Sequence, residues 1–177
     1  MPRENSKRLE FWGVANRLGE VVKKHWKSKL EVKIKVFFWK VIHKGLPVGD
    51  RVSHFVDDVR CLRCGERETI EHICWTGCVA GGIWGGHMTG HRAMVSYSKV
   101  KGLEIIPILA WCCWKARNLM VFEGLSGSTR DAWALVMRFA ATVVQNQTVE
   151  IKGVAGDFLK LLEQGRVLES ALGQFIT

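Results

Sequence analysis

Four side chains in the middle of the chain have the types and the spacing of a metal site. Cys61 and Cys64 are separated by two residues. His72 follows after seven intervening residues, and Cys78 comes after five more. A Cys-x-x-Cys turn presents two thiolates to one ion, and tetrahedral zinc binds four Cys or His ligands. The remaining two ligands then come from the returning segment 68–78. The sequence therefore predicts a zinc site whose ligands are Cys61, Cys64, His72 and Cys78.

Two alternatives stay open at this site. Free cysteines are among the residues most often buried, so these thiols could belong to the core. Cys74 also follows His72, and spacing alone does not choose between Cys74 and Cys78. We prefer Cys78, because His72 and Cys74 are only two residues apart in the chain. Without Cys78 the site would keep an open position of the catalytic type, with Glu68 or Glu71 as the base, which we do not favour.

The composition is that of a folded protein from a reducing compartment. The 177 residues fit one domain or a domain with an extension, and 47% hydrophobic residues with eight Trp supply a core. The first eight residues are polar and charged, so no secretory signal is expected. Six cysteines then indicate metal binding and an intracellular location, nuclear or cytoplasmic. No run reaches the roughly 18 consecutive apolar residues of a membrane span, so we expect no membrane partner.

Positive charge is concentrated ahead of the predicted metal site. Within a net charge of +9, residues 1–60 carry 14 Lys and Arg against 7 Asp and Glu, whereas residues 124–177 carry 5 against 5. Residues 23–44 contain eight lysines, with Trp26 and Trp39 among them. Lysines can follow a phosphate backbone while exposed Trp rings stack on bases. The alternative is a solvated lysine face, and we place Trp39 in the core because of its helical spacing with apolar neighbours.

Apolar periodicity predicts a mainly α fold, with about five or six helices around the metal loop. We expect helices at residues 9–26, 31–44, 48–55, 80–84, 105–122 and 129–145, and one final helix that covers 154–162 and, past Gly165, 167–175. Trp26 lies on the predicted buried stripe of the first of these, and Phe55 on that of the third. Gly45 and Ser128 are placed to cap helices. The strongly apolar helix 105–122 is expected to be too short and too interrupted to span a membrane.

Further motifs stand on both sides of the predicted site. An aromatic, lysine-rich segment at 32–40 and Leu46-Pro47 precede it, and Ile83-Trp84 follow it. The later segment 111–118 reads Trp-Cys-Cys-Trp-Lys-Ala-Arg-Asn. In this order the motifs resemble the zinc-binding region that lies downstream of the polymerase in plant reverse transcriptases of the non-LTR, long-interspersed-element type. The resemblance implies the same four ligands. One departure is that the family usually has four residues between the His and the last Cys, where this chain has five.

The resemblance implies a module without catalytic domains. No Tyr-x-Asp-Asp-like carboxylate pair is present, and two-metal nucleotidyl transfer needs several converging carboxylates, so no enzyme activity is expected. We predict an N-terminal helical extension at 1–28, a zinc-binding domain at 29–124 and a C-terminal helical extension at 125–177. The predicted partner is RNA or DNA, bound by Lys23, Lys24, Lys27, Lys29, Lys33, Lys35, Lys40 and Lys44. The alternatives are a structural or protein-interaction module that self-associates, and a transposon remnant with no selected activity.

Overall fold

The computed structural model describes residues 18–55, 59–84, 89–90, 92–93, 104–124, 128–148 and the single positions 151, 157 and 160. Seven helical elements lie within these residues. The elements are α2 (Leu18–Lys27), α3 (Val32–Ile42), α4 (Gly49–Val52), the π-helical turn η1 (His72–Thr76), α5 (Ala80–Trp84), α7 (Ile105–Glu123) and α8 (Thr129–Gln145). The predicted mainly α fold is therefore confirmed. The first half of the helix predicted at 9–26, and nearly all of the one predicted at 154–162 and 167–175, lie outside the described residues.

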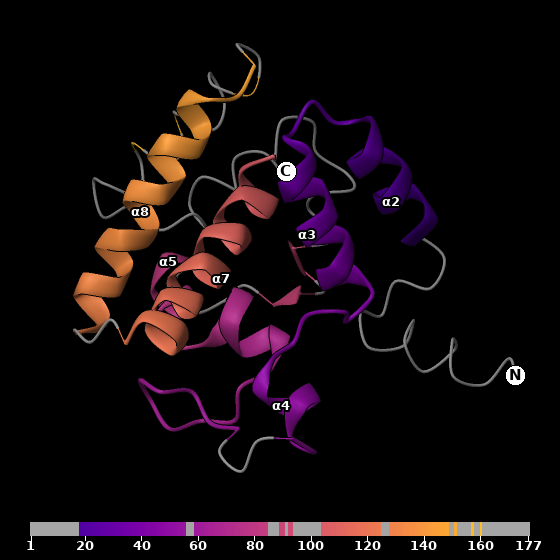
Figure 1. Cartoon of the computed structure of the whole chain (residues 1–177). Coiled ribbons are helices and arrows are strands. Elements are labelled where there is room, and N and C mark those ends of the chain that lie inside the picture. Colours follow the sequence, from indigo (N-terminus) through magenta and orange to yellow (C-terminus); the bar gives the residue numbers. More distant parts are fainter. Residues whose placement is uncertain are drawn as a thin grey trace, which may run out of the picture.

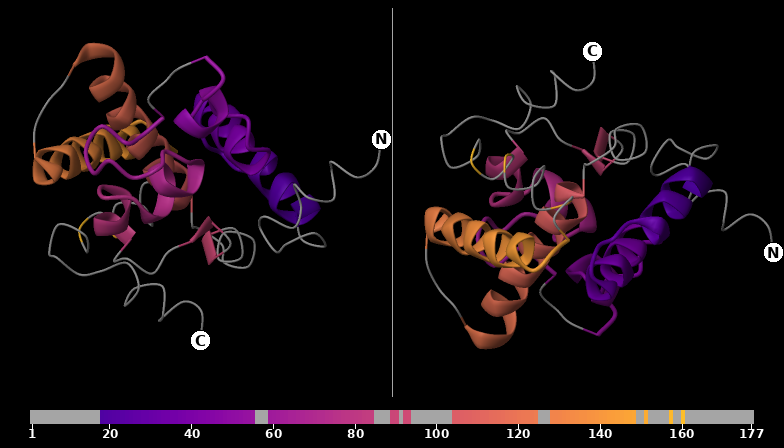
Figure 2. Two further views of the ribbon diagram at one scale, coloured as in Figure 1. Left: turned by 90° about the horizontal axis from the view of Figure 1, so that it is seen from below. Right: turned by 90° about the horizontal axis from the view of Figure 1, so that it is seen from above.

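The four longer helices lie side by side in the order α8, α7, α3, α2 (Figure 1). α7 contacts α8, α3 and η1, and η1 packs in turn on α5. The α2–α3 pair and α8 lie on opposite sides of the molecule, with α7, η1 and α5 between them (Figure 2). Trp75 of η1 and Trp84 of α5 are fully buried there, with ring centroids 5.5 Å apart. α7 is thus the central helix, which α3, α8 and η1 all contact.

Burial explains the apolar composition of α7. Ten of its 19 residues are buried, Cys112 and Cys113 among them. The helix is in fact long and apolar enough to cross a membrane by length and composition, so the expectation that it is too short is wrong. However, 56% of its most apolar window is buried inside the fold, and the core helix of a folded domain passes the same test. The apolar sequence of α7 is accounted for by its central position.

α2 packs on α3 through a face that is rotated from the predicted one. Val21 and His25 are fully buried, whereas Trp26, predicted to face the core, is 45% exposed. His25 Nε2 lies 2.8 Å from the Lys35 carbonyl oxygen, and the His25 ring centroid is 5.1 Å from that of Phe38. Burial lowers the pKa of His25 and favours the neutral ring. Because the hydrogen bond satisfies the imidazole, a histidine can fill the position expected for Trp26.

α3 has the predicted buried face but a partly apolar exposed face. The apolar pattern predicts a stripe of Ile34, one of Phe37 and Phe38, Val41 and Ile42, and the structure buries these positions with both phenylalanines. Trp39 is 40% exposed, and its ring centroid lies 4.4 Å from that of His43. Each residue advances about 100° around a helix, so burying positions 34, 37, 38 and 41 turns positions 36, 39 and 40 outward. The core position preferred for Trp39 is therefore wrong.

The end of α3 is built differently from the prediction. Lys44, not Gly45, adopts the left-handed conformation, with φ +53°. The Gly45 N–H donates to the Lys40 carbonyl at 2.6 Å and the Lys44 N–H to that of Val41 at 3.1 Å, which is the Schellman pattern of a helix C-terminus. The predicted cap is thus off by one residue.

The other two predicted helix ends have opposite outcomes. Ser128 caps α8 as predicted, because its hydroxyl accepts the Asp131 N–H at 3.2 Å while the Asp131 carboxylate accepts the Ser128 N–H at 2.7 Å. α4 is shorter than predicted, and Phe55, expected to point inward, is 88% exposed.

Candidate metal centre

One cluster of metal-binding side chains stands out among the described residues. The ligand atoms of Cys61, Cys64, His72 and Cys78 all lie within 4.8 Å of one another. Cys64 Sγ is 3.4 Å from His72 Nε2. A tetrahedral zinc ion with Zn–S bonds of about 2.3 Å places its ligand atoms about 3.8 Å apart. Three thiolates and one imidazole are also a donor set of structural zinc sites. Donor chemistry and spacing therefore both fit zinc.

Cys61 and Cys64 are carried by a tight loop, residues 60–67, which we call the knuckle. Its two ends pair in an isolated antiparallel bridge. The Cys61 N–H donates to the Glu66 carbonyl at 2.7 Å, and the Gly65 N–H donates back to the Cys61 carbonyl at 2.9 Å. Gly65 has φ +72°, which a glycine adopts without strain. These bonds close the turn that presents both thiols to the same point.

His72 and Cys78 are carried by the π-helical turn η1 and the residues after it. The Thr69 hydroxyl accepts the His72 N–H at 3.0 Å at the start of this turn. The Gly77 N–H donates to the His72 carbonyl at 2.7 Å and closes it. A π-turn takes up one residue more than an α-turn. The extra residue between His72 and Cys78, by which this chain departs from the family it resembles, is absorbed there, and Cys78 stays beside the other three groups.

Gly77 lies too close to His72 for any other residue. A Cβ at this position would be 2.3 Å from the His72 carbonyl oxygen and 2.8 Å from the Nε2 atom of its ring. The backbone at Gly77 is extended, with φ −70°, so the requirement is for space and not for an unusual conformation. Gly77 therefore allows the imidazole to reach the cluster.

Cys74, the alternative ligand, is placed in the core. It is fully buried, and burial raises the pKa of its thiol far above the usual range. Its carbonyl oxygen accepts the Trp84 Nε1–H at 2.8 Å. A strand would place His72 and Cys74 on the same face, but the segment is a helical turn. Positions two apart in an α-helix are about 200° apart, so the turn directs Cys74 away from His72.

The surroundings of the cluster set the protonation of its members. Burial, together with the nearby Cys61 and Cys64 thiols, raises the pKa of Cys78 to about 12. Burial lowers the pKa of His72, against the opposing effect of nearby glutamates, and so favours the neutral imidazole that a metal ion needs. A thiol must lose its proton when it binds a metal, so metal affinity falls as the pH falls.

A buried ion pair joins the segment behind the knuckle to α7. Arg117 Nε donates to Glu68 Oε2 at 3.0 Å, and Arg117 Nη2 donates to Glu68 Oε1. The Gly49 N–H reaches the same Oε1 atom at 2.9 Å. The two side chains are only 5% and 13% exposed. Sequence reasoning missed this pair, because its partners are 49 residues apart and share no local pattern.

The two glutamates that were weighed as catalytic bases are both engaged elsewhere. The Glu68 carboxylate is taken by Arg117 and Gly49. Glu71 Oε1 accepts the Gly90 N–H at 2.9 Å, and burial raises the pKa of this carboxyl. With Cys78 in the cluster, four protein groups complete a tetrahedral set, as in structural zinc sites.

The predicted nucleic-acid-binding lysines lie on α2, α3 and the connection between them. Exposed members are Lys23, Lys27, Lys29, Lys33 and Lys40, and half-buried ones are Lys24, Lys35 and Lys44. Lys33 pairs with Glu31 at 2.6 Å, and Lys35 Nζ donates to the Trp26 carbonyl at 3.3 Å. Burial lowers the pKa of Lys24. None of these lysines belongs to the metal cluster.

Fold and site together define a small helical module with a Cys3His cluster that is compatible with zinc. Residues 10–84 match the model of a protein family described as zinc-binding in reverse transcriptase, and all four cluster residues fall within this match. No curated protein and no solved structure matches the chain. The matching family is an accessory zinc-binding domain and not a catalytic one, and it agrees with the predicted cofactor, zinc.

The close approach of Gly77 to His72 generates a first prediction. Gly77→Ala should weaken zinc binding by about 10- to 100-fold, the usual effect of disturbing the groups that orient a ligand. Competition with a chromophoric chelator measures this affinity. Gly82→Ala is the matched control, because a Cβ there meets nothing within 4 Å, and it should retain the affinity of the unaltered chain. Equal zinc affinities in the two variants would contradict the role given to Gly77.

The two neighbouring ion pairs of this region should differ widely in their contribution. Arg117→Ala leaves the buried Glu68 carboxylate without its cation and should lower the free energy of unfolding by about 3–5 kcal/mol. Arg67→Ala removes the exposed pair with Asp50 and should cost less than about 1 kcal/mol. Urea unfolding of the zinc-loaded proteins compares them, and similar losses would show that the buried pair does not hold the loop.

Proposed function

We propose that this chain is a zinc-stabilised, non-catalytic module that binds RNA or DNA through its α2–α3 surface. We further propose that it is related to the region downstream of the polymerase in plant non-LTR reverse transcriptases. Its zinc ligands are Cys61, Cys64, His72 and Cys78. The observation that carries the nucleic-acid part is the charge of α2 and α3.

A structural role for the metal follows from the closed ligand set. A catalytic zinc keeps one position open for water, whereas four protein donors converge in this chain. The ion links the knuckle to η1 and the residues after it, since Cys61 and Cys64 come from the one and His72 and Cys78 from the other. Most knuckle residues are exposed, so packing alone contributes little to its stability. Metal binding energy then becomes folding energy.

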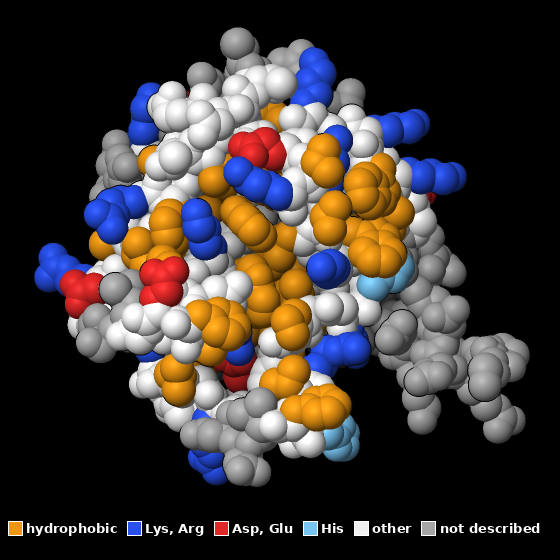
Figure 3. Space-filling view, in the orientation of Figure 1, with side chains coloured by type: hydrophobic (Ala, Val, Ile, Leu, Met, Phe, Trp, Pro, Cys, Tyr) orange, Lys and Arg blue, Asp and Glu red, His pale blue; other side chains and the backbone are white. Residues whose placement is uncertain are grey.

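The charge of the α2–α3 surface supports a polyanionic partner. Residues 18–45 carry eight lysines against two glutamates, and one of these, Glu31, already pairs with Lys33. Lys and Arg side chains surround a group of hydrophobic side chains over α2 and α3 (Figure 3). Each helix is about 15 Å long, enough to run past several phosphates of a nucleic acid. Lysines in such an array attract phosphates through charge and released counterions, with little sequence preference.

A protein-interaction role is the second candidate, and exposed apolar side chains favour it. Phe122 and Val121, at the end of α7, are 76% and 37% exposed, and Leu62 of the knuckle is 65% exposed. Such residues could dock on another protein or on a second copy of the chain. Salt-independent dimers in light scattering, without affinity for nucleic acid, would favour this function over the first.

The ligand assignment predicts which cysteines zinc requires. Mass spectrometry of the native protein should find one zinc per chain, and Cys61→Ser and Cys78→Ser should lose it. Cys74→Ala should retain it, since this thiol lies in the core. A strong chelator should also lower the thermal midpoint of the unaltered protein. Full zinc content in Cys78→Ser, or an unchanged midpoint with the chelator, would refute the proposed site.

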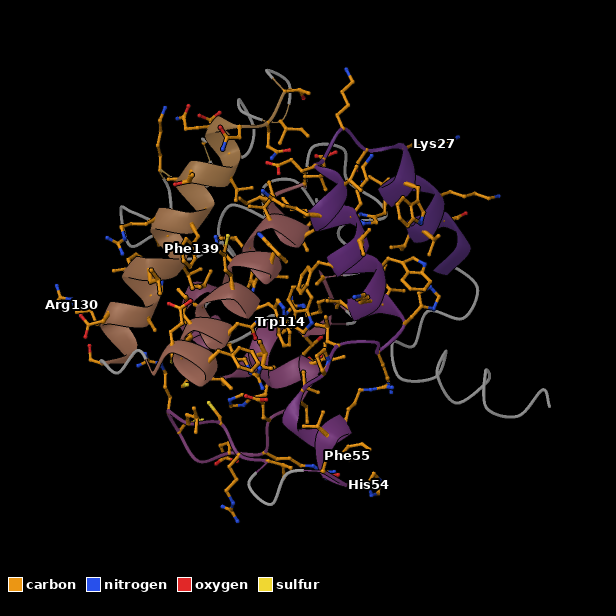
Figure 4. All side chains as sticks on the ribbon, in the orientation of Figure 1. Lys27, His54, Phe55, Trp114, Arg130 and Phe139 are labelled. Carbon is orange, nitrogen blue, oxygen red and sulfur yellow. The ribbon has the colours of Figure 1, made fainter. Side chains whose placement is uncertain are left out.

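The charge argument predicts a change in the salt dependence of binding. Lys27→Ala with Lys40→Ala should reduce the slope of log affinity against log salt by about 1.4 for single strands, or about 1.8 for a duplex. Arg130→Ala with Arg138→Ala removes the same charge from exposed positions of α8 and should leave the slope unchanged. Lys27 and Arg130 lie on opposite sides of the molecule (Figure 4). Equal slopes in the two double variants would show that net charge acts without a specific surface.

A further inference from the structure

The exposed face of α2 and α3 carries large apolar side chains among its lysines. Trp26 and Trp39 are 45% and 40% exposed, and Val32 and Val36 are 71% and 39% exposed. Tryptophan is among the most buried side chains on average, so two half-exposed rings on one surface need a reason. The lysines alone would satisfy a partner that offers only phosphates.

The two rings belong to the same surface. Lys35 Nζ donates to the carbonyl oxygen of Trp26 at the end of α2. Trp39 is one turn beyond Lys35 on α3, and residues four apart are neighbours on a helix face. Lys35 therefore stands between the two tryptophans and joins them into one array.

Each ring is also braced by a histidine. The Trp39 centroid is 4.4 Å from that of His43, and the two rings are tilted by 42°. The Trp26 centroid is 6.0 Å from that of His25, whose Nε2 is hydrogen-bonded to the Lys35 carbonyl. Side chains that are already held in place lose less entropy when a ligand binds. The rings are thus prepared to receive a flat partner.

Exposed cations lie on the same two helices as the rings. Lys23 and Lys27 lie three residues before and one residue after Trp26, and all three are exposed on α2. Lys40 follows Trp39 directly and is also exposed. The array thus offers flat apolar groups between cations. An acidic peptide would satisfy the cations but not the rings, and a duplex would satisfy the cations but keeps its base faces stacked inside.

The geometry points to single-stranded RNA or DNA as the ligand, with bases stacked on Trp26 and Trp39 and phosphates on the flanking lysines. This inference rests on the proposed function and names its substrate class. Base stacking on aromatic rings tolerates any sequence, because every base has a flat face. The surface therefore selects an unpaired strand and not a particular sequence.

Fluorescence anisotropy with the zinc-loaded full chain tests this inference. The probes are a labelled single strand of about 12 nucleotides and the duplex of the same sequence, at about 50 mM salt. The single strand should bind at least about tenfold more tightly than the duplex. Trp26→Ala and Trp39→Ala should each weaken single-strand binding at least about fivefold, and leave duplex binding unchanged. Trp39→Phe, which keeps a ring, should restore most of the affinity.

A control variant separates stacking from the general loss of an exposed aromatic ring. Phe55 is 88% exposed and lies at the end of the molecule away from Lys27 (Figure 4). Phe55→Ala should leave single-strand affinity unchanged. Circular dichroism of each Trp variant should match that of the unaltered chain, because both rings lie outside the core.

The remaining outcomes distinguish this inference from the proposed function. Equal affinity for both probes, unaffected by the Trp variants, overturns stacking but leaves nucleic-acid binding in place. No binding to either probe overturns both. A dimer that dissociates in Trp39→Ala, with no affinity for either probe, would assign the surface to a second copy of the chain.

Discussion

A single carboxylate, that of Glu68, joins three parts of this structure. Its oxygens accept two N–H groups of Arg117 from α7 and the backbone N–H of Gly49 at the start of α4. The carboxylate is nearly inaccessible to water, so its charge is tolerable only because these donors are all present. The knuckle has no comparable apolar anchorage, since most of its residues are exposed. The buried Glu68 contact therefore acts together with the Arg63 contact to Met120 of α7 in fixing where the knuckle stands against the central helix.

Local signals in the sequence were enough to predict most of the described helices and the Cys3His cluster. The apolar spacing of α3 and α7, and the Ser128 cap of α8, depend on residues within one or two turns of each other, where the chemistry of a helix acts. The cluster was predictable because two cysteines separated by two residues restrict their own geometry. The Glu68–Arg117 ion pair could not be predicted, because its partners are 49 residues apart. The π-turn was missed as well, since its cause is a count of residues between two ligands and not a pattern within the turn.

Trp26 and Trp39 were both misplaced because their hydrophobicity assigns them to the core, and for Trp26 a buried histidine explains the difference. Hydrophobicity assigns tryptophan to the core and histidine to the surface, and periodicity then selects the wrong face of α2. The structure reverses the assignment because the Lys35 carbonyl provides His25 with a hydrogen bond that no reading of α2 alone could anticipate. Neighbouring residues are about 100° apart around a helix, so burying His25 directs Trp26 away from the core. The result matters for function, because the lysine-rich surface gains the aromatic rings that a surface for phosphates alone does not need.

Metal loop and lysine-rich surface are connected through a chain of packed groups. Arg117, held by Glu68, lies over the ring of Trp114 at 5.1 Å, and the Trp114 centroid is 6.4 Å from that of Phe37 on α3. Trp111 contacts the same Phe37 at 5.3 Å. Figure 4 places Trp114 near the centre of the side chains that fill the space between these elements. Such a path gives α3 a fixed position relative to the ion. A packed path of this kind supports the surface, whereas regulation would require a second stable arrangement of the same contacts.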